Sequence, residues 1–282
     1  MANMNELAGE LPIDLLEAID RVLAAAMPHA PGLEPSEVMV VGATARDLHH
    51  HALGHQFSTA ATQDLDLALA LRSWDTFMAL LNAFKPAGNS GIRFKISDVI
   101  VDLLPFGDIE DPQGIATPPI RLEPMRVWAL KEVFDNALEL ILPSGVTVKV
   151  PTVAGYAATK LGAWLDRHEW DETRDARDIA LVIYWYGDAS EVNSRIFDTE
   201  DGQNAYLEES GDVFLASAHL LGRDIASTVG EARLAELLER WPGDYELLVR
   251  EFAFTGGSWP ASTERRKQII AALTRGLRLA LP

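Results

Sequence analysis

The sequence predicts an α+β protein in which a mixed β-sheet flanked by helices is followed by a helical region. Short apolar runs alternate with amphipathic segments up to Pro151, and the pattern stays helical from there to the end of the chain. The length of 282 residues suits one large domain or two ordinary ones, and 48% hydrophobic residues suffice to fill a sizeable core. We therefore expect one domain over residues 1–150 and a second over residues 151–282.

The elements of the first domain follow from hydrophobic periodicity and from the residues that interrupt it. Apolar side chains at steps of three and four predict helices, whereas short apolar runs that end at glycine or a polar turn predict strands. Helices are expected over 12–27, 44–53 and 73–84. Strands are expected over 38–41, 65–71, 92–96, 99–104, 137–142 and 146–150. Residues 106–124, rich in Pro, Gly and Asp, are expected to form a long loop that covers something.

The second domain is predicted to be helical throughout. Helices are expected over Thr152–Asp166 and Glu172–Tyr186. A polar stretch at 188–205 is expected to separate them from several further helices.

Composition excludes several classes of function. With no cysteine, disulfides, thiol nucleophiles, Fe–S clusters and cysteine-ligated zinc are excluded. We find no signal-peptide pattern and no apolar run long enough to span a membrane, so we expect a cytoplasmic protein without a membrane partner. The net charge of −18 gives no global sign of the basic face typical of nucleic-acid binders, although acidity also simply confers solubility.

An Asp-x-Asp pair, Asp64 and Asp66, stands at the start of an apolar strand. Residues two apart in a strand point to the same face, so the two carboxylates would lie side by side. A divalent cation makes such a pair tolerable, and carboxylate oxygens suit Mg²⁺ or Mn²⁺. Taken alone, the pair is weak evidence, because most Asp-x-Asp pairs are turn or edge residues.

A third carboxylate, Asp102, lies inside the apolar run VIVDLL. Burying it is costly unless it is paired or bound to metal. If its strand neighbours the strand of Asp64 and Asp66, the three carboxylates form a ligand set for two metal ions. The alternative is that Asp102 faces solvent, but Ile100 and Leu104 on the same face are apolar, so that face is expected to be half buried.

The segment VVGATARDL predicts a strand that turns at Gly42 directly into a helix. Backbone N–H groups at a helix N-terminus attract phosphate, and glycine permits close approach. We consider Thr44 and Arg46 as further phosphate contacts, with pairing of Arg46 to Asp47 as the purely structural alternative. The histidines that follow, His49, His50, His51 and His55, suggest either a solvated helix end or a zinc site.

Together these motifs resemble the DNA-polymerase-β-like nucleotidyltransferase superfamily, and more specifically the bacterial AbiEii-like nucleotidyltransferases, some of which act as toxins. The resemblance covers roughly residues 36–186. It implies a nucleotidyltransferase-fold sheet and a Mg²⁺- or Mn²⁺-dependent transfer of a nucleoside monophosphate from a triphosphate to an acceptor hydroxyl. It also implies a toxin–antitoxin setting, with a cognate antitoxin protein as a partner.

The resemblance also implies a role for each matching residue. Asp64, Asp66 and Asp102 would be the metal ligands and catalytic carboxylates, with Asp102 helping to deprotonate the attacking hydroxyl. Gly42, Ala43, Thr44 and Arg46 would bind the triphosphate together with Lys160 of TKLGAWLDR. Asp175 or Asp178 of RDARDIALVIYW would orient Lys160 or contact the nucleotide.

Two departures from the family pattern keep other functions open. Ala43 replaces the family's usual serine or glycine, and the stretch from Ala43 to Asp64 is longer than in many relatives. These departures motivate a degenerate binding or regulatory protein as the alternative. GATARDLHHHALG also resembles a segment of tRNA nucleotidyltransferases, which suggests an RNA-tailing enzyme. The sequence leaves the acceptor open among tRNA, a protein side chain and a small molecule.

Overall fold

The computed structural model describes residues 3–7, 9–60, 64–120, 123–167, 174–243, 246–252, 257 and 259–279. The chain divides into two compact units, Met1–Thr152 and Val153–Pro282. This division falls next to the domain boundary that we place at residue 150. The α+β class with a mixed sheet is confirmed.

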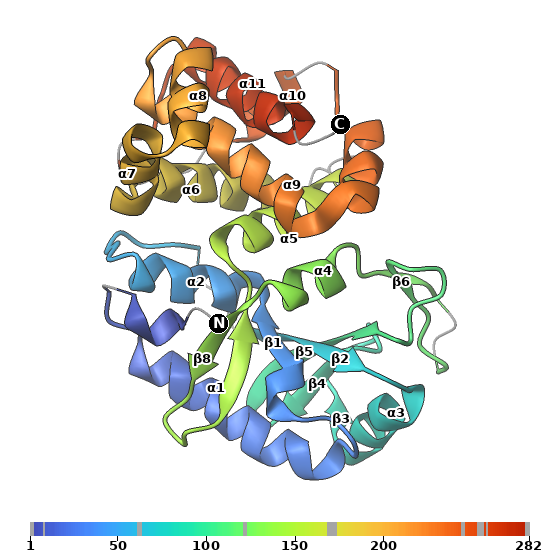
Figure 1. The fold of residues 1–282 in the computed structure, drawn as a ribbon. Coiled ribbons are helices and arrows are strands. Elements are labelled where there is room, and N and C mark those ends of the chain that lie inside the picture. Colours follow the sequence, from blue (N-terminus) through green and yellow to red (C-terminus); the bar gives the residue numbers. More distant parts are fainter. Residues whose placement is uncertain are drawn as a thin grey trace. The chain divides into compact units, whose positions relative to one another are not determined.

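The first unit is built on a seven-stranded sheet with the order β3-β4-β5-β2-β1-β9-β8 (Figure 1). The pairs β2/β5 and β1/β9 are parallel, and the other neighbouring pairs are antiparallel. Its strands are β1 (Val38–Val41), β2 (Asp64–Leu71), β3 (Lys85–Pro86), β4 (Arg93–Ile96), β5 (Val99–Gly107), β8 (Leu138–Ile141) and β9 (Thr147–Val150). The short strands β6 (Ile115–Ala116) and β7 (Met125–Arg126) form a separate pair.

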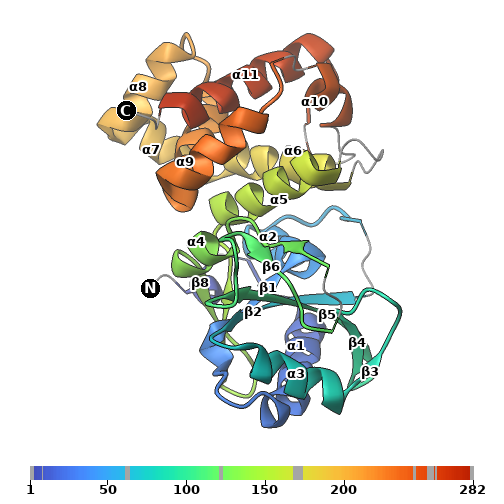
Figure 2. The ribbon, with the colours of Figure 1, turned by 90° about the vertical axis from the view of Figure 1, so that its right-hand side faces the viewer.

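Four α-helices are described in this unit: α1 (Ile13–Ala26), α2 (Gly42–Ala52), α3 (Trp74–Ala83) and α4 (Leu130–Asp135). Helices α1 and α3 lie on one face of the sheet, and α2 and α4 lie on the other (Figures 1 and 2). The inner strand β1 is buried along its whole length because it has a strand on each side and helices over both faces.

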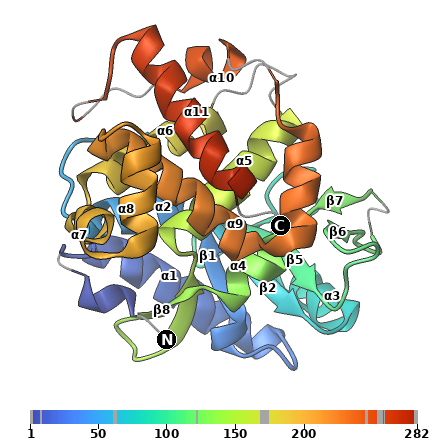
Figure 3. The same ribbon diagram turned by 45° about the horizontal axis from the view of Figure 1, so that its top comes forward.

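The second unit is entirely helical in its described residues. Its helices are α5 (Val153–Arg167), α6 (Arg174–Asp188), α7 (Ser190–Asp198), α8 (Glu200–Glu208), α9 (Val213–Arg240), α10 (Glu246–Glu251) and α11 (Thr263–Leu279). Helix α11 lies beside α9 (Figure 3). A Cβ at Gly222 would lie 2.3 Å from the Leu273 carbonyl oxygen, and one at Gly276 would lie 2.0 Å from that of His219. Glycine at these two crossing points therefore permits the close approach.

The expected elements occur with small shifts at their ends, and three regions differ from expectation. The stretch 188–205, predicted to be a polar separator, forms most of helices α7 and α8. Its apolar residues are too few to show a clear period, but Ile196 and Ala205 pack against Ala216 and Leu220 of α9. The loop predicted over 106–124 begins two residues later than expected, since β5 continues to Gly107, and it contains β6. Helix α4 was not predicted.

No helix in the described ranges is both long enough and apolar enough to cross a membrane.

Candidate active site

The register of the sheet brings the three predicted aspartates to one face. Strands β2 and β5 run parallel, and Asp66 lies directly beside Asp102. Asp64 is two residues before Asp66 on β2, so its side chain points to the same face. Three carboxylates that are far apart in the sequence therefore share one patch of the sheet.

An arginine from the next strand, Arg93 of β4, occupies this patch. It pairs in register with Asp102. Its Nε donates to Asp102 Oδ1 at 2.8 Å and its Nη2 to Asp102 Oδ2 at 2.7 Å, a forked geometry that favours strong pairing. The same Nη2 also donates to Asp64 Oδ2 at 2.5 Å. These hydrogen bonds and charges, with Asp102 contributing most and Asp66 also contributing, raise the pKa of the Arg93 guanidinium.

The patch is partly open to solvent. The side chains of Asp102, Asp64 and Arg93 are 15%, 30% and 38% exposed. The residues flanking Asp102 on β5, Val101 and Leu103, are buried on the opposite face. The predicted half-buried environment of Asp102 is therefore present, and Arg93 compensates for the cost of placing a carboxylate there.

The turn at Gly42 lies directly against Asp66. Val41, the last residue of β1, pairs with Asp66 across the antiparallel β1/β2 ladder. Gly42 then begins α2 with a φ of +61°. A Cβ built on Gly42 would lie 1.9 Å from Asp66 Oδ2, so only glycine leaves room for this carboxylate. The predicted phosphate-binding turn and the Asp-x-Asp motif are thus adjacent.

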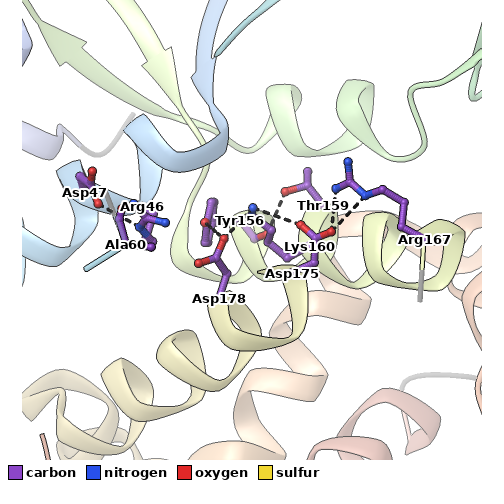
Figure 4. A network of polar contacts seen from close by, with 9 residues as sticks. All are labelled: Arg46, Asp47, Ala60, Tyr156, Thr159, Lys160, Arg167, Asp175 and Asp178. Carbon is purple, nitrogen blue, oxygen red and sulfur yellow. Dashed lines mark hydrogen bonds and ion pairs between the residues drawn. The ribbon is translucent and has the colours of Figure 1, made fainter. Parts of the chain in front are cut away.

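The other predicted phosphate contacts of this turn are turned inward. Thr44 is 1% exposed and Arg46 is 5% exposed. Arg46 Nε donates to Asp47 Oδ1 at 2.9 Å, and its Nη2 donates to the Ala60 carbonyl at 2.5 Å (Figure 4). This is the structural alternative considered for Arg46. Gly42 and Ala43 are the partly exposed residues of the turn.

Lys160, Asp175 and Asp178 lie together in the second unit. Lys160 Nζ is 2.6 Å from Asp178 Oδ2 and 3.2 Å from Asp175 Oδ1 (Figure 4). Arg167 pairs with Asp175 at 2.7 Å, and the Tyr156 hydroxyl donates to Asp178 Oδ2 at 3.0 Å. The local cause is helical spacing, because Tyr156, Lys160 and Arg167 share one face of α5 while the two aspartates lie three apart on α6.

Two histidines of α2, His49 and His50, are buried in the fold, whereas His51 at the end of the helix is exposed. His49 is fully buried, and its Nε2–H donates to the Pro151 carbonyl at 2.7 Å. Burial lowers the pKa of His49 to about 4, and it also lowers that of His50, which bonds the Phe57 carbonyl at 2.8 Å. No group of three or more His, Cys, Asp or Glu side chains within the described ranges is arranged to hold a metal ion.

Sequence reasoning missed Arg93, although the signal was present. A tight turn at Ser97 and Asp98 was predicted, and both residues have positive φ. Such a turn pairs residue 96 with 99 and therefore Arg93 with Asp102. Counting residues outward from this predicted turn identifies Arg93 as the cross-strand partner of Asp102. Tyr156 was also missed, and its signal is the step of four residues to Lys160.

Comparison with known proteins adds no family assignment. No protein-family model matches this chain, and no curated protein matches it in sequence.

Proposed function

We propose that this protein is a metal-dependent nucleotidyltransferase of the DNA-polymerase-β-like type, with the AbiEii-like enzymes as the family it resembles. The observation that supports this most is the shared register of Asp64, Asp66 and Asp102 beside the Gly42 turn. Three carboxylates and an open backbone turn are the parts that a metal-bound triphosphate needs.

The donor atoms of these residues are of the kind that Mg²⁺ or Mn²⁺ binds, although the three carboxylates, with Arg93 paired to two of them, are not arranged as a metal-ligand group in this structure. All three side chains offer hard oxygen ligands, which these ions prefer. The patch already attracts a cation, since the Arg93 guanidinium lies between Asp102 and Asp64. In this proposal Asp64, Asp66 and Asp102 hold the metal, which when bound supplies charge stabilisation to the transferring phosphoryl group.

The chain's own groups then position the triphosphate and deprotonate the acceptor hydroxyl. The Gly42–Ala43 turn binds phosphate oxygens through backbone N–H groups, with Thr44 and Arg46 supporting the turn from within. Asp102 accepts the proton of the acceptor hydroxyl. The acceptor oxygen bonds to the α-phosphorus as the bond from that phosphorus to the bridging oxygen breaks, and pyrophosphate leaves with the electron pair.

Lys160 is proposed to neutralise charge on the triphosphate, as the resemblance implies. Its contacts with Asp175 and Asp178 hold its ammonium group in place. We propose a toxin of a toxin–antitoxin pair as the biological setting, with tRNA as one acceptor to test first.

A labelling assay tests the proposal. Each labelled nucleoside triphosphate is incubated with the protein, Mg²⁺ and fractionated cell extract. The wild type is expected to label one fraction, and Asp66→Asn is expected to lower the rate at least about 1000-fold, or about 4 kcal/mol of transition-state stabilisation. Asp98→Asn is the matched control, because it makes the same chemical change at the β4–β5 turn, outside the proposed metal site. The side chain of Asp98 is 92% exposed. Near-normal turnover by Asp66→Asn would remove Asp66 from the metal site.

A degenerate binding or regulatory protein is the second candidate, and Arg93 is the observation that favours it. A guanidinium held by Asp102 and Asp64 resembles a permanent replacement for a metal ion. Calorimetric titration with Mg²⁺ and each triphosphate separates the candidates. Nucleotide binding that requires Mg²⁺ supports the enzyme, and its absence supports the degenerate protein.

A further inference from the structure

Three carboxylates, those of Asp64, Asp66 and Asp102, share the patch of β2 and β5 with the guanidinium of Arg93. Neighbouring carboxylates repel one another, and a cation placed between them lowers that repulsion. The Arg93 guanidinium and a divalent cation can both supply this positive charge, so they would compete for the same carboxylate oxygens.

The position of Arg93 allows its guanidinium to exchange with a metal ion at the carboxylates. Its guanidinium makes all three of its hydrogen bonds here to two of the predicted metal ligands, Asp102 and Asp64. It is also the most exposed member of the three, at 38% of its side chain. A long, partly exposed side chain can leave by rotating about its own bonds, whereas the aspartates are fixed by the strands that carry them.

We propose that Arg93 is a displaceable counter-ion, which neutralises Asp64 and Asp102 when no divalent cation is bound and is displaced when one binds. This inference deepens the proposed function and rests on its assignment of the three aspartates as metal ligands. Arg93 would thereby hold the ligands together before binding and set how tightly a cation is retained.

Competition has a measurable consequence. A metal ion binds only the fraction of molecules in which Arg93 has left, so its apparent affinity falls by that fraction. If Arg93 is in place in about 90–99% of metal-free molecules, removing it tightens metal binding about 10- to 100-fold. Removal also takes a positive charge away from the carboxylates, so the metal-free protein loses stability and regains it when metal is added.

The test measures Mn²⁺ binding, not turnover, by isothermal titration calorimetry and by thermal melting with EDTA or Mn²⁺. Arg93→Gln is expected to bind Mn²⁺ at least about tenfold more tightly than the wild type and to gain more melting temperature from Mn²⁺. Arg93→Lys keeps the charge but loses the fork, so it should fall between the two and serves if Arg93→Gln fails to fold.

Arg72→Gln is the matched control. Arg72 pairs with Glu37 on the same unit, and it follows the far end of β2, eight residues from Asp64. At a strand rise of about 3.3 Å per residue it lies about 26 Å away, well beyond the screening length. Its loss of charge should therefore leave Mn²⁺ affinity unchanged.

The outcomes separate this inference from the proposed function. Tighter binding by Arg93→Gln supports the inference, and if the wild type binds no Mn²⁺ at all while Arg93→Gln does, the inference stands but the enzyme proposal fails. If the wild type and Arg93→Gln bind Mn²⁺ equally and the labelling assay is positive, the enzyme stands and the inference is overturned. Absence of Mn²⁺ binding in every variant overturns both.

Discussion

Each unit of this molecule contains a cluster of aspartates and basic side chains, but the two clusters differ in the exposure of their carboxylates. On α5 and α6, Lys160 and Arg167 pair with Asp175 and Asp178, and the two carboxylates are 4% and 11% exposed. On the sheet, Arg93 pairs with Asp102 and Asp64, and these two carboxylates are 15% and 30% exposed. The carboxylates of the sheet cluster are therefore the more open to solvent.

This difference in exposure bears on what each cluster can do. Enclosed charges are costly unless each has a partner, so the paired carboxylates of α5 and α6 depend on their basic partners. The carboxylates of the sheet are more accessible, so a dissolved cation can reach them at a lower desolvation cost. Exposure therefore favours the sheet cluster as the candidate for ligand binding.

Replacing Lys160 tests the helical side of the comparison and has the largest expected effect on stability. Lys160→Ala leaves Asp178 with only the Tyr156 hydroxyl among the partners described above and weakens the pairing of Asp175. Breaking an enclosed ion pair from one side costs about 3 kcal/mol or more. Urea unfolding at pH 7 measures the loss, and Arg93→Gln in EDTA, at the more exposed cluster, should lose less.

The same variant also bears on the proposed enzyme. If Lys160 neutralises the triphosphate, Lys160→Ala should raise KM for the triphosphate more than it lowers kcat. Loss of stability with unchanged KM and kcat would assign Lys160 to the fold alone. Lys160→Arg, which keeps the charge, should recover part of the stability.

Acid titration distinguishes the two units by the pH range in which each loses stability. The pKa of His49 is about 4 in the folded state, against an ordinary value of 6.5, because the ring is buried. Its neutral form therefore stabilises the first unit above pH 6.5, and this contribution is lost as the pH falls from 6.5 to 4, by up to about 3 kcal/mol. In the second unit, pairing with Arg195 lowers the pKa of Asp201 to about 2, so its contribution is lost only between about pH 3.8 and 2.

His49→Gln provides the measurement. The variant has a constant cost at all pH values from lost packing, but its unfolding free energy should vary less between pH 7 and 4.5 than that of the wild type. Parallel pH curves for the two proteins would show that His49 does not titrate on unfolding in this range. Asp201→Asn is the control, since removing this carboxylate should leave the change in unfolding free energy between pH 7 and 4.5 the same as in the wild type.

The sequence was sufficient for the parts of both clusters that depend on local spacing. The strand alternation of Asp64 and Asp66 and the apolar setting of Asp102 follow from a period of two. The sequence did not reveal which side chains contact these aspartates, because tertiary packing sets the order of the strands. The β4–β5 turn alone indicated the position of Arg93 beside Asp102. For the same reason, the sequence could not decide whether Arg46 points inward, since one of its hydrogen-bond acceptors is the carbonyl of a residue fourteen positions away. The helices at 190–208 were missed because their burial depends on α9.

Gly42 offers the finest test of the sheet cluster, with a small expected effect on stability and a larger one on binding. Alanine at a φ of +61° costs about 1 kcal/mol of backbone strain, and its Cβ must displace the Asp66 carboxylate, whose Oδ2 would be 1.9 Å away. We expect Gly42→Ala to lower Mn²⁺ affinity, since Asp66 can no longer hold its position beside Asp102. Gly32→Ala is the matched control, because Gly32 also has a positive φ, of +77°, but has nothing within 4 Å of its Cβ position. An equal loss of stability in the two variants with a loss of Mn²⁺ affinity only in Gly42→Ala would place Asp66 in the cation site, and equal affinity in both would remove it from there.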